Sequence, residues 1–383
     1  MISVDGPVRS VQVTIFCLRN LIRENNPGTV GKILFVVGPA LGHAARAVNL
    51  ARGLRRRGYE IHFAGADTRK LTQEVVGSEF PLHRLAGMDY AADVSFSNAL
   101  THCMERLLPS AICYDLSPLP WLAQLARFPV PEVYITNAFL TRLGQDRTFQ
   151  DAMFAKHATR WNRLRAQRGI PPLTDGRALY ERDLVLLADP PDLLAGRALP
   201  AHYRVIGPCS WNPPTALPDE IHPMQHILYI SMGSTGRRTL PEALVHRLAE
   251  ELACPHIVAV EGEETLKRLT DYSYARLPGS AVLERAGFAL TQGGTGSVYQ
   301  ALEKGVPVGC WPHDHNHQVF GRWVEQKGLA VLFEPESWET KIDGLREQLP
   351  QLTARARALA RSLDALDGNF EASEHIDTLL RNR

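Results

Sequence analysis

The stretch 32–64 has the order of a strand, a glycine turn, a helix and a second strand. Residues 33–37 form a short continuous apolar run, which is typical of a buried parallel strand. After the glycine turn at 38–42, residues 43–57 carry apolar side chains at helical spacing, and residues 59–64 form the next apolar run. Such a β-turn-α-β unit builds a parallel sheet with right-handed crossovers, so the chain is predicted to be an α/β protein.

The same plan recurs in both halves of the chain. Further short apolar runs predict strands at 111–114, 133–136, 184–187, 227–231, 257–260, 288–291 and 306–311. Residues 207–223 contain five prolines and a glycine, a density that disfavours both helices and central strands, so this segment is predicted to be an interdomain linker.

The predicted organisation therefore has five parts. They are an N-terminal extension 1–29, an N-terminal Rossmann-like domain 30–206, the linker 207–223, a C-terminal Rossmann-like domain 224–360 and a helical tail 361–383. The extension does not fit the pattern that follows it, and three interpretations stay open: a leader helix, a domain extension, or translation from an upstream start codon.

Composition excludes several classes of protein. Lys and Arg total 42 against 41 Asp and Glu, so the net charge of +1 carries no electrostatic footprint for nucleic acid. The six cysteines form no CxxC pair, which argues against a disulfide framework or a zinc ribbon. No apolar run approaches the ~18 residues of a membrane span, and the first ten residues lack the order of a secretory signal. A cytoplasmic protein is expected.

The first candidate site is the glycine turn GPALGHAAR at 38–46. His43 lies near the first turn of the predicted helix, where the positive end of the helix dipole disfavours a protonated imidazole. A neutral imidazole in this position could act as a general base. The alternative is that His43 is a capping or core histidine.

The second candidate site is the glycine loop TQGGTGS at 291–297, between a predicted strand and a predicted helix. Backbone N–H groups at a helix N-terminus form a cradle for a diphosphate, and Thr295 and Ser297 add hydroxyl donors. The alternative is a tight turn that needs glycine for its geometry alone. The loop is neither GxxxxGK[ST] nor GxGxxG, which disfavours a P-loop ATPase and a standard nicotinamide site.

Several segments, in this order, resemble the nucleotide-sugar glycosyltransferases of the GT-B fold, especially the UDP-glycosyltransferase and macrolide glycosyltransferase group. They are GHAARAVNLARGLRRRGYEIHFAG, RGIPPL, VIGPCSWNPP, YISMGSTG and LTQGGTGSVYQALEKGVPVGCWP. The resemblance runs from about Lys32 to about Glu334, which is most of the chain. It implies two doubly wound Rossmann-like domains that face each other across a cleft.

The resemblance also implies a catalytic pair. His43 corresponds to the family's base, which takes a proton from an acceptor hydroxyl or amine, and the acceptor then displaces the nucleoside diphosphate with inversion. Asp115, at the end of AICYD, matches the aspartate that orients this histidine and stabilises the imidazolium. The alternative for Asp115 is a helix N-cap. The scheme requires no metal and no cofactor.

The resemblance places the donor on the C-terminal domain. The residues expected to bind it are Gly233, Ser234, Arg276, Leu277, Gln292, Gly293, Gly294, Thr295, Gly296, Ser297, Gln300, Asp314, His317 and Gln318. Gln318 is expected to hold sugar hydroxyls with His317 in the place of a carboxylate, and Asp314 is the other candidate. The run 313–318 has residue types that suit zinc, but adjacent side chains of an extended chain point to opposite faces.

Two positions depart from the family's pattern. Gln292 stands where the family usually has a histidine that contacts the donor phosphate, and glutamine can donate a hydrogen bond but cannot become cationic. Gln300 stands where UDP users often have a glutamate that binds the ribose hydroxyls. Enzymes that use dTDP-deoxysugars often lack that glutamate, so UDP and dTDP are equally weighted, and weakened donor binding is a third alternative.

The acceptor is expected to lie against the N-terminal domain. The residues expected to contact it are Gly42, Phe139, Phe154 and Trp161, although the last two would also suit a core. In 141–169, seven cations outnumber two aspartates. That excess fits either a solvated helix face or a surface for an acidic acceptor or an anionic membrane.

The sequence thus predicts an inverting, metal-independent glycosyltransferase that moves a sugar from a UDP- or dTDP-sugar to a small-molecule or lipid acceptor. No nucleic-acid partner and no transmembrane segment are expected, while peripheral membrane contact is compatible with the composition. The competing prediction, motivated by Gln292 and Gln300, is a nucleotide-sugar-binding partner of another transferase without catalysis of its own. A nucleotide-sugar epimerase of the same fold is a weaker third.

Overall fold

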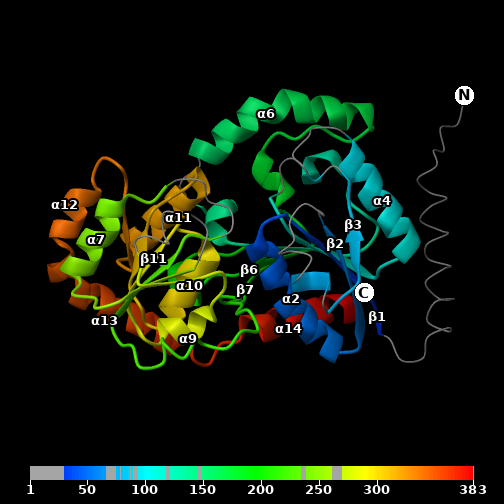
Figure 1. The fold of residues 1–383 in the computed structure, drawn as a ribbon. Coiled ribbons are helices and arrows are strands. Elements are labelled where there is room, and N and C mark those ends of the chain that lie inside the picture. The colour runs from blue at the N-terminus through cyan, green and yellow to red at the C-terminus, as the bar shows by residue number, and fades with distance from the viewer. Residues whose placement is uncertain are drawn as a thin grey trace, which may run out of the picture.

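The computed structural model describes residues 30–65, 75–77, 79–86, 88, 94–117, 121–144, 148–233, 239–260 and 270–382. The predicted extension 1–29 lies outside these residues. The chain forms two parallel sheets, with the domain of the first sheet on the right of Figure 1 and that of the second on the left. The prediction of two doubly wound α/β domains is confirmed.

The first sheet has the strand order β3-β2-β1-β4-β5-β6-β7. Its strands are β1 (Gly31–Val37), β2 (Tyr59–Gly65), β3 (Leu82–Arg84), β4 (Ala111–Asp115), β5 (Glu132–Thr136), β6 (Leu184–Leu187) and β7 (Tyr203–Val205). Its helices are α2 (Leu41–Arg56), α4 (Ser95–Leu107) and α6 (Thr148–Gln167), with the short 3₁₀ turns η1 (Leu122–Gln124), η2 (Ala138–Leu140), η3 (Gly176–Leu179) and η4 (Pro191–Leu194).

The second sheet has the order β10-β9-β8-β11-β12-β13. Its strands are β8 (Ile227–Ser231), β9 (Ile257–Val260), β10 (Tyr272–Tyr274), β11 (Ala286–Thr291), β12 (Val308–Cys310) and β13 (Ala330–Leu332). The helices are α7 (Glu242–Glu251), α9 (Gly279–Leu283), α10 (Thr295–Glu303), α11 (His315–Gln326), α12 (Trp338–Asp343), α13 (Leu345–Leu363) and α14 (Gly368–Arg381). The segment 206–226, which contains the predicted linker, has neither helix nor strand.

The first β-turn-α-β unit forms as its pattern predicts. The apolar run 33–37 is completely buried in β1, which lies between β2 and β4. The apolar stripe of α2 covers this sheet, and Ala47, Val48 and Ala51 have no exposed surface. Gly58, at a φ of +90°, then turns the chain from α2 into β2, a conformation that a Cβ atom disfavours.

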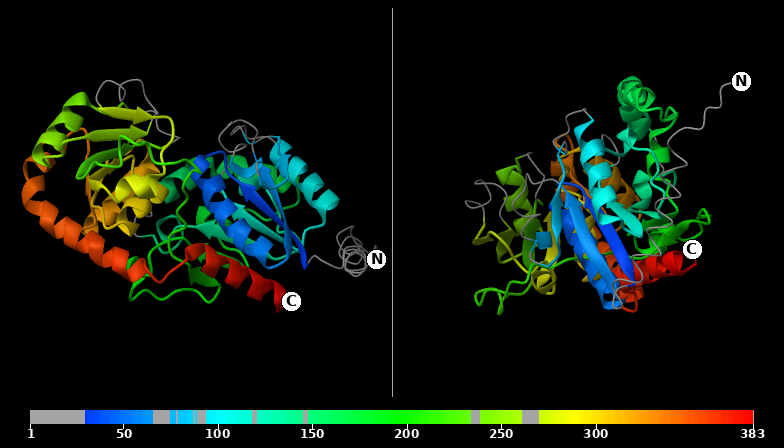
Figure 2. Two further views of the ribbon diagram at one scale, coloured as in Figure 1. Left: turned by 60° about the horizontal axis from the view of Figure 1, so that its bottom comes forward. Right: turned by 90° about the vertical axis from the view of Figure 1, so that its right-hand side faces the viewer.

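The C-terminal end of the chain crosses back to the first domain. Helix α13 runs along the second domain, and α14 then lies beside α2, as Figures 1 and 2 show in red. Ala372 and Ile376 of α14 belong to the same apolar cluster as Ala51, and the Tyr59 hydroxyl donates to Asp377 Oδ1 at 2.8 Å. The predicted tail therefore packs on the N-terminal domain.

The sequence analysis missed the edge strands β3, β7, β10 and β13, and it did not predict α4 as a helix. Each of these strands has three residues, which is too short for a periodic pattern to show. Among the described residues, none of the helices is both long enough and apolar enough to cross a membrane.

Candidate active site

A cavity of about 760 Å³ lies between the two domains and takes walls from both. Its volume is within the range of small-molecule sites in proteins. Fourteen of the residues singled out from the sequence line it. They are Gly42, His43, Phe139, Gly233, Arg276, Leu277, Gln292, Gly293, Gly294, Thr295, Gly296, Ser297, Gln300 and His317. The structure thus brings His43 of the first domain and Ser297 of the second to one crevice.

Two of the residues expected to contact the acceptor, Phe154 and Trp161, are not among the residues that line this cavity. Trp161 is 4% exposed and belongs to the core beneath α6. Phe154 packs against Gly176, where a Cβ atom would lie 3.0 Å from the Phe154 ring. Both aromatic side chains are therefore used to pack α6 against its own domain.

Two of the expected donor residues also lie outside the lining of the cavity. Asp314 caps α11, where Oδ1 accepts from the His317 backbone N–H at 3.0 Å, and it is mostly exposed. Gln318 turns to Glu334, with Nε2 to Oε1 at 2.8 Å. Gln318 is thus hydrogen-bonded within its own domain, and its contact with the sugar stays a prediction. Ser234 lies outside the described residues.

His43 and Asp115 form a short hydrogen bond. The His43 Nδ1 to Asp115 Oδ1 distance is 2.6 Å, and Asp115 has no exposed surface. Asp115 is the last residue of β4 and pairs in register with Val37, directly before the turn into α2, so the sheet itself brings the two side chains together. With Nδ1 bound to the carboxylate, the imidazole can present Nε2 to the cavity as a proton acceptor.

Arg46 is a site residue that the sequence analysis did not single out. It lies one helical turn after His43, and its Nε and Nη2 donate to the two oxygens of Asp115, both at 2.7 Å. Burial alone raises the pKa of Asp115, but Arg46 and then His43 outweigh it and lower this pKa below its usual value. The available signal was the i, i+3 spacing of His43 and Arg46 on one helix face.

The two glycine turns of the second domain lie side by side. They follow β8 and β11, which are adjacent and pair Ser231 with Thr291. Gly233 has a φ of +68°, and a Cβ atom there would lie 2.1 Å from Gln292 Nε2. Gln292 is 7% exposed, and among the described residues its Oε1 has no hydrogen-bond partner. A buried amide oxygen in a cavity wall favours a ligand that carries a donor group.

We expect Gly233→Ala to weaken the binding of the nucleoside diphosphate that the resemblance implies, because the new methyl group would displace the Gln292 amide and strain a left-handed backbone. Isothermal titration calorimetry with UDP and with dTDP would measure this loss. Gly196→Ala is the matched control, since Gly196 has a φ of +78° but open space around its Cβ position. Equal loss of binding in both variants would contradict the steric explanation.

Gln300 lines the cavity, but the linker holds its amide nitrogen. Nε2 donates to Trp211 O at 3.1 Å and to Asn212 Oδ1 at 3.0 Å. The Gln300 side chain therefore connects α10 to the linker. Its Oε1 is the atom that can accept a hydrogen bond from a ligand hydroxyl. The resemblance implies the position of a ribose-binding glutamate for Gln300, while the contacts of its amide nitrogen are structural.

The histidine-rich run starts a helix, which corrects the assumption that it is extended. Asp314 caps α11, and the His313 and His317 rings pack edge to face with centroids 6.4 Å apart. Burial lowers the pKa of His317, against the opposing effect of Asp314, so its ring is neutral near pH 7. Within the described parts of the chain, no three His, Cys, Asp or Glu side chains are placed to hold one metal ion.

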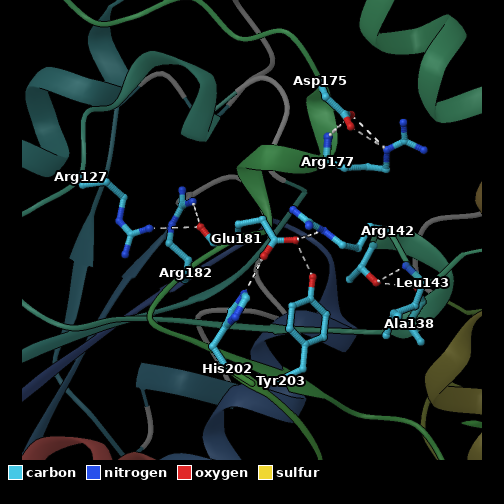
Figure 3. Close-up of polar contacts among 11 residues, drawn as sticks. Arg127, Ala138, Arg142, Leu143, Asp175, Arg177, Glu181, Arg182, His202 and Tyr203 are labelled. Carbon is cyan, nitrogen blue, oxygen red and sulfur yellow. Dashed lines mark hydrogen bonds and ion pairs between the residues drawn. The ribbon is translucent and has the colours of Figure 1, made fainter. Parts of the chain in front are cut away.

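Ionic contacts stabilise the part of the cavity wall that contains Tyr180. Glu181 follows Tyr180, a cavity residue, and accepts from Tyr203 at 2.8 Å and His202 at 2.6 Å. Figure 3 shows Glu181 at the centre of these contacts, with Arg142 2.7 Å from Oε1. The network ties the segment after η2 to the edge of the sheet.

The cations of 141–169 divide into two kinds. Arg165 is 8% exposed and donates to the carbonyl oxygens of Pro171 and Ala123, so it is a structural residue. Lys156, Arg160, Arg163 and Arg168 are exposed. Arg147 lies outside the described residues.

Sequence comparison finds related glycosyltransferases. A PGL/p-HBAD biosynthesis glycosyltransferase of Mycobacterium tuberculosis is 28% identical, and the alignment covers 91% of this chain and 92% of the relative. A PGL/p-HBAD biosynthesis rhamnosyltransferase of Mycobacterium bovis is 26% identical, with 91% of this chain and 88% of the relative covered. No model of a known protein family matches the sequence.

Solved structures show the same fold. The calicheamicin glycosyltransferase CalG4 superposes with a TM-score of 0.68 over 92% of this chain and 98% of its own, at 20% identity. The glycosyltransferase VinC in complex with dTDP gives 0.66 over 92% and 100%, at 16% identity. The chain is a glycosyltransferase of the GT-B fold.

One relative of this glycosyltransferase carries a different description. A protein of Mycobacterium bovis named an inactive PGL/p-HBAD biosynthesis glycosyltransferase is 27% identical, over 57% of this chain and 70% of the relative. Relatives of similar identity thus include proteins named glycosyltransferases and a protein named an inactive glycosyltransferase. The functional argument therefore rests on the residues of this chain, above all on the His43–Asp115 pair.

Proposed function

We propose that this glycosyltransferase transfers a sugar with inversion from a UDP- or dTDP-sugar to a hydroxyl or amine of a small-molecule or lipid acceptor, without a metal ion. The observation that carries the proposal is the His43–Asp115 pair, which lies at the wall of a cavity shared with the glycine loop of the second domain. A base and a diphosphate cradle on facing walls are what a direct displacement requires.

In the proposed mechanism, His43 Nε2 takes the proton of the acceptor as the acceptor atom attacks the anomeric carbon. The bond between that carbon and the diphosphate oxygen breaks, and the nucleoside diphosphate leaves with the electron pair. Asp115 holds the imidazole by Nδ1 and stabilises the imidazolium that forms. Attack from the face opposite the leaving group inverts the anomeric centre.

The leaving diphosphate is proposed to lie at the N-terminus of α10, next to the turn at Gly293 and Gly294. The free N–H groups of the first helical turn and the positive end of the helix dipole stabilise its developing charge. Ser297 Oγ, now 3.1 Å from Gly294 O, adds a hydroxyl at the same point. These groups supply the charge stabilisation that a divalent cation would otherwise provide.

The donor nucleotide is proposed to be UDP or dTDP. The position of Gln300 fits a dTDP-deoxysugar, and the names of a related rhamnosyltransferase and of VinC with dTDP support this choice. A lipid is the first acceptor class to test, alongside the acceptors of the relatives named for PGL/p-HBAD biosynthesis. The apolar residues Phe139, Leu140 and Leu116 on the acceptor side of the cavity are compatible with such an acceptor.

The test measures nucleoside diphosphate release and product formation with UDP- and dTDP-sugars, in buffer with and without EDTA. We expect activity to be unchanged by the chelator, and we expect the product to have the anomeric configuration opposite to that of the donor in its NMR spectrum. Loss of activity in EDTA that magnesium restores would contradict the metal-independent mechanism. Retention of configuration would contradict direct displacement.

The alternative proposal is a nucleotide-sugar-binding partner without turnover. The engagement of Gln300 by the linker and the relative named inactive favour it. Donor binding by calorimetry and the release measurements distinguish this alternative from an active transferase. Tight donor binding without diphosphate release, in the presence of hydroxyl and amine acceptors, supports the non-catalytic partner.

A further inference from the structure

A buried chain of hydrogen bonds continues beyond the catalytic pair. Arg46, which holds both oxygens of Asp115, also donates from Nη1 to Asn137 Oδ1 at 3.1 Å. Asn137 Nδ2 in turn donates to Asp189 Oδ1 at 3.0 Å and to Ala188 O at 2.8 Å. The polar groups are thus linked one to the next along the wall of the cavity, whose lining includes Arg46 and Asn137.

The last member of this chain comes from the other domain. Tyr299 of α10 donates its hydroxyl to Asp189 Oδ1 at 2.6 Å. Tyr299 lies two residues after Ser297, so the helix that starts at the glycine loop is bonded directly to the first domain. The Tyr299 ring also packs edge-on against Phe320, which contacts Phe139 of the first domain with centroids 5.2 Å apart.

The sheet explains why these side chains meet. Strands β4, β5 and β6 are neighbours, and Asp115, Asn137 and Asp189 lie at or just beyond their carboxyl ends. Asp115 and Asp189 have no exposed surface, and Asn137 is 3% exposed. Buried polar groups of this kind hold a unique arrangement only when every member has its partner.

The hydrogen bond from Tyr299 crosses the domain boundary to a buried carboxylate. Burial raises the pKa of Asp189, and the bond from Tyr299 is the largest of the contributions that oppose this shift, followed by the Ala138 N–H and Asn137. Arg46 lies between the two carboxylates and stabilises the charged form of each. The Cys209 thiol also lies near Arg46, but burial raises its pKa to about 12, so it stays uncharged near neutral pH.

We propose that Arg46 and Tyr299 are positioning residues for sugar transfer: Arg46 holds Asp115 and through it the His43 ring, and Tyr299 connects this arrangement to the donor-binding helix. The inference rests on the proposed function, because it needs His43 to act as the base. One continuous network of hydrogen bonds would then fix both the position of the base, His43, and the position of α10, which the donor contacts.

The first test replaces Arg46. In Arg46→Gln, the Asp115 carboxylate loses the two hydrogen bonds and the positive charge of the guanidinium, so it holds the His43 ring less firmly. We expect kcat/KM at pH 7 to fall about 10- to 100-fold and the acidic limb of the pH–activity profile to move. Arg46→Lys, which keeps the charge, should restore part of both. Arg52→Gln, on the same helix and bonded to Glu79, is the matched control and should leave the limb in place.

The second test removes one hydroxyl group. Tyr299→Phe should lower kcat/KM about tenfold, and its effect should not add to that of Arg46→Lys, because residues of one network are coupled. Tyr59→Phe is the matched control, since the Tyr59 hydroxyl also donates to a buried carboxylate, Asp377, far from the cavity. Additive effects of Tyr299→Phe and Arg46→Lys would overturn the continuous chain.

A measurement without turnover separates this inference from the proposed function. The His43 ring can be titrated by NMR in the whole protein, with its signals assigned by their absence in His43→Asn. We expect the titration midpoint in Arg46→Gln to differ from that of the unmodified protein, because a charge next to Asp115 has been removed. An unchanged midpoint overturns the role of Arg46. Absence of sugar transfer by the unmodified protein, with the midpoint shifted, overturns the proposed function and leaves the network in place.

Discussion

His43→Ala should reduce the rate of sugar transfer by about 10²- to 10⁴-fold, which is the usual contribution of a positioned general base. His43 is the side chain at the cavity wall that Asp115 orients, and without it the acceptor hydroxyl must lose its proton to water. The substitution leaves the glycine loops at 233 and 292–297 unchanged. Donor affinity is therefore expected to stay within about threefold, so the loss should appear in kcat.

Steady-state kinetics and calorimetry with the donor nucleotide would together check this result. His222→Ala is the matched control, because His222 is exposed and is not part of the cavity lining. Full activity of His43→Ala would remove the mechanism proposed above. Loss of donor binding in parallel with activity would show that His43 contributes to the donor site and not to proton transfer.

Asp115→Asn should affect both catalysis and stability. Asparagine has one acceptor oxygen and no charge, so it cannot accept hydrogen bonds from both His43 and Arg46 as the carboxylate does. His43 then loses its fixed tautomer, and Arg46 is left as a buried cation without a counter-charge. Removal of one member of a buried ion pair costs about 3–5 kcal/mol of unfolding free energy. The transfer rate should fall at least about 10²-fold. Thermal unfolding and steady-state kinetics measure the two effects.

The stability effect has a defined pH dependence. The pKa of Asp115 lies below its usual value of 3.8 in the folded protein. The carboxylate therefore contributes its full stabilisation at pH values above 3.8, and the contribution is lost as the pH falls through the lower, folded-state value. The difference in unfolding free energy between Asp115→Asn and the unmodified protein should shrink as the pH falls below 3.8.

Asp367→Asn is the matched control for this charge neutralisation. Asp367 is exposed and caps α14 by accepting from Asn369 and Phe370, and asparagine is as good an N-cap as aspartate. Its stability and activity should match those of the unmodified protein. A similar loss of stability and activity in Asp367→Asn and Asp115→Asn would contradict a specific role for the buried ion pair.

The parts of the site that could be predicted from sequence are those that depend on short local sequence patterns. The glycine turns at Gly233 and Gly293 need left-handed backbone that glycine adopts readily, and each follows an apolar strand directly. His43 directly follows Gly42 in the first turn of α2, and Asp115 stands at the end of an apolar run. Since parallel strands end at one edge of a sheet, the meeting of these segments followed from their order.

Other parts of the site could not be predicted because their signal is ambiguous at the level of a single residue. Trp161 and Phe154 have the composition of an acceptor wall, but aromatic side chains also fill cores, and here they pack α6. Gln318 could turn toward a sugar or toward Glu334, and only the packing of α11 beside β13 selects the second. Asp314 could point into a site or cap a helix, and it caps α11.

What the sequence by itself determined is the order of strands, turns and helices, and hence two parallel sheets with a base-bearing turn on one and a glycine cradle on the other. What the tertiary structure alone decided is the set of long-range polar bonds: Arg46 to Asp115, Asn137 to Asp189, and Tyr299 to Asp189. The physical reason is that backbone conformation depends on near neighbours. The partner of a buried charge depends on which side chains the folded sheets and the domain contact bring within hydrogen-bond distance.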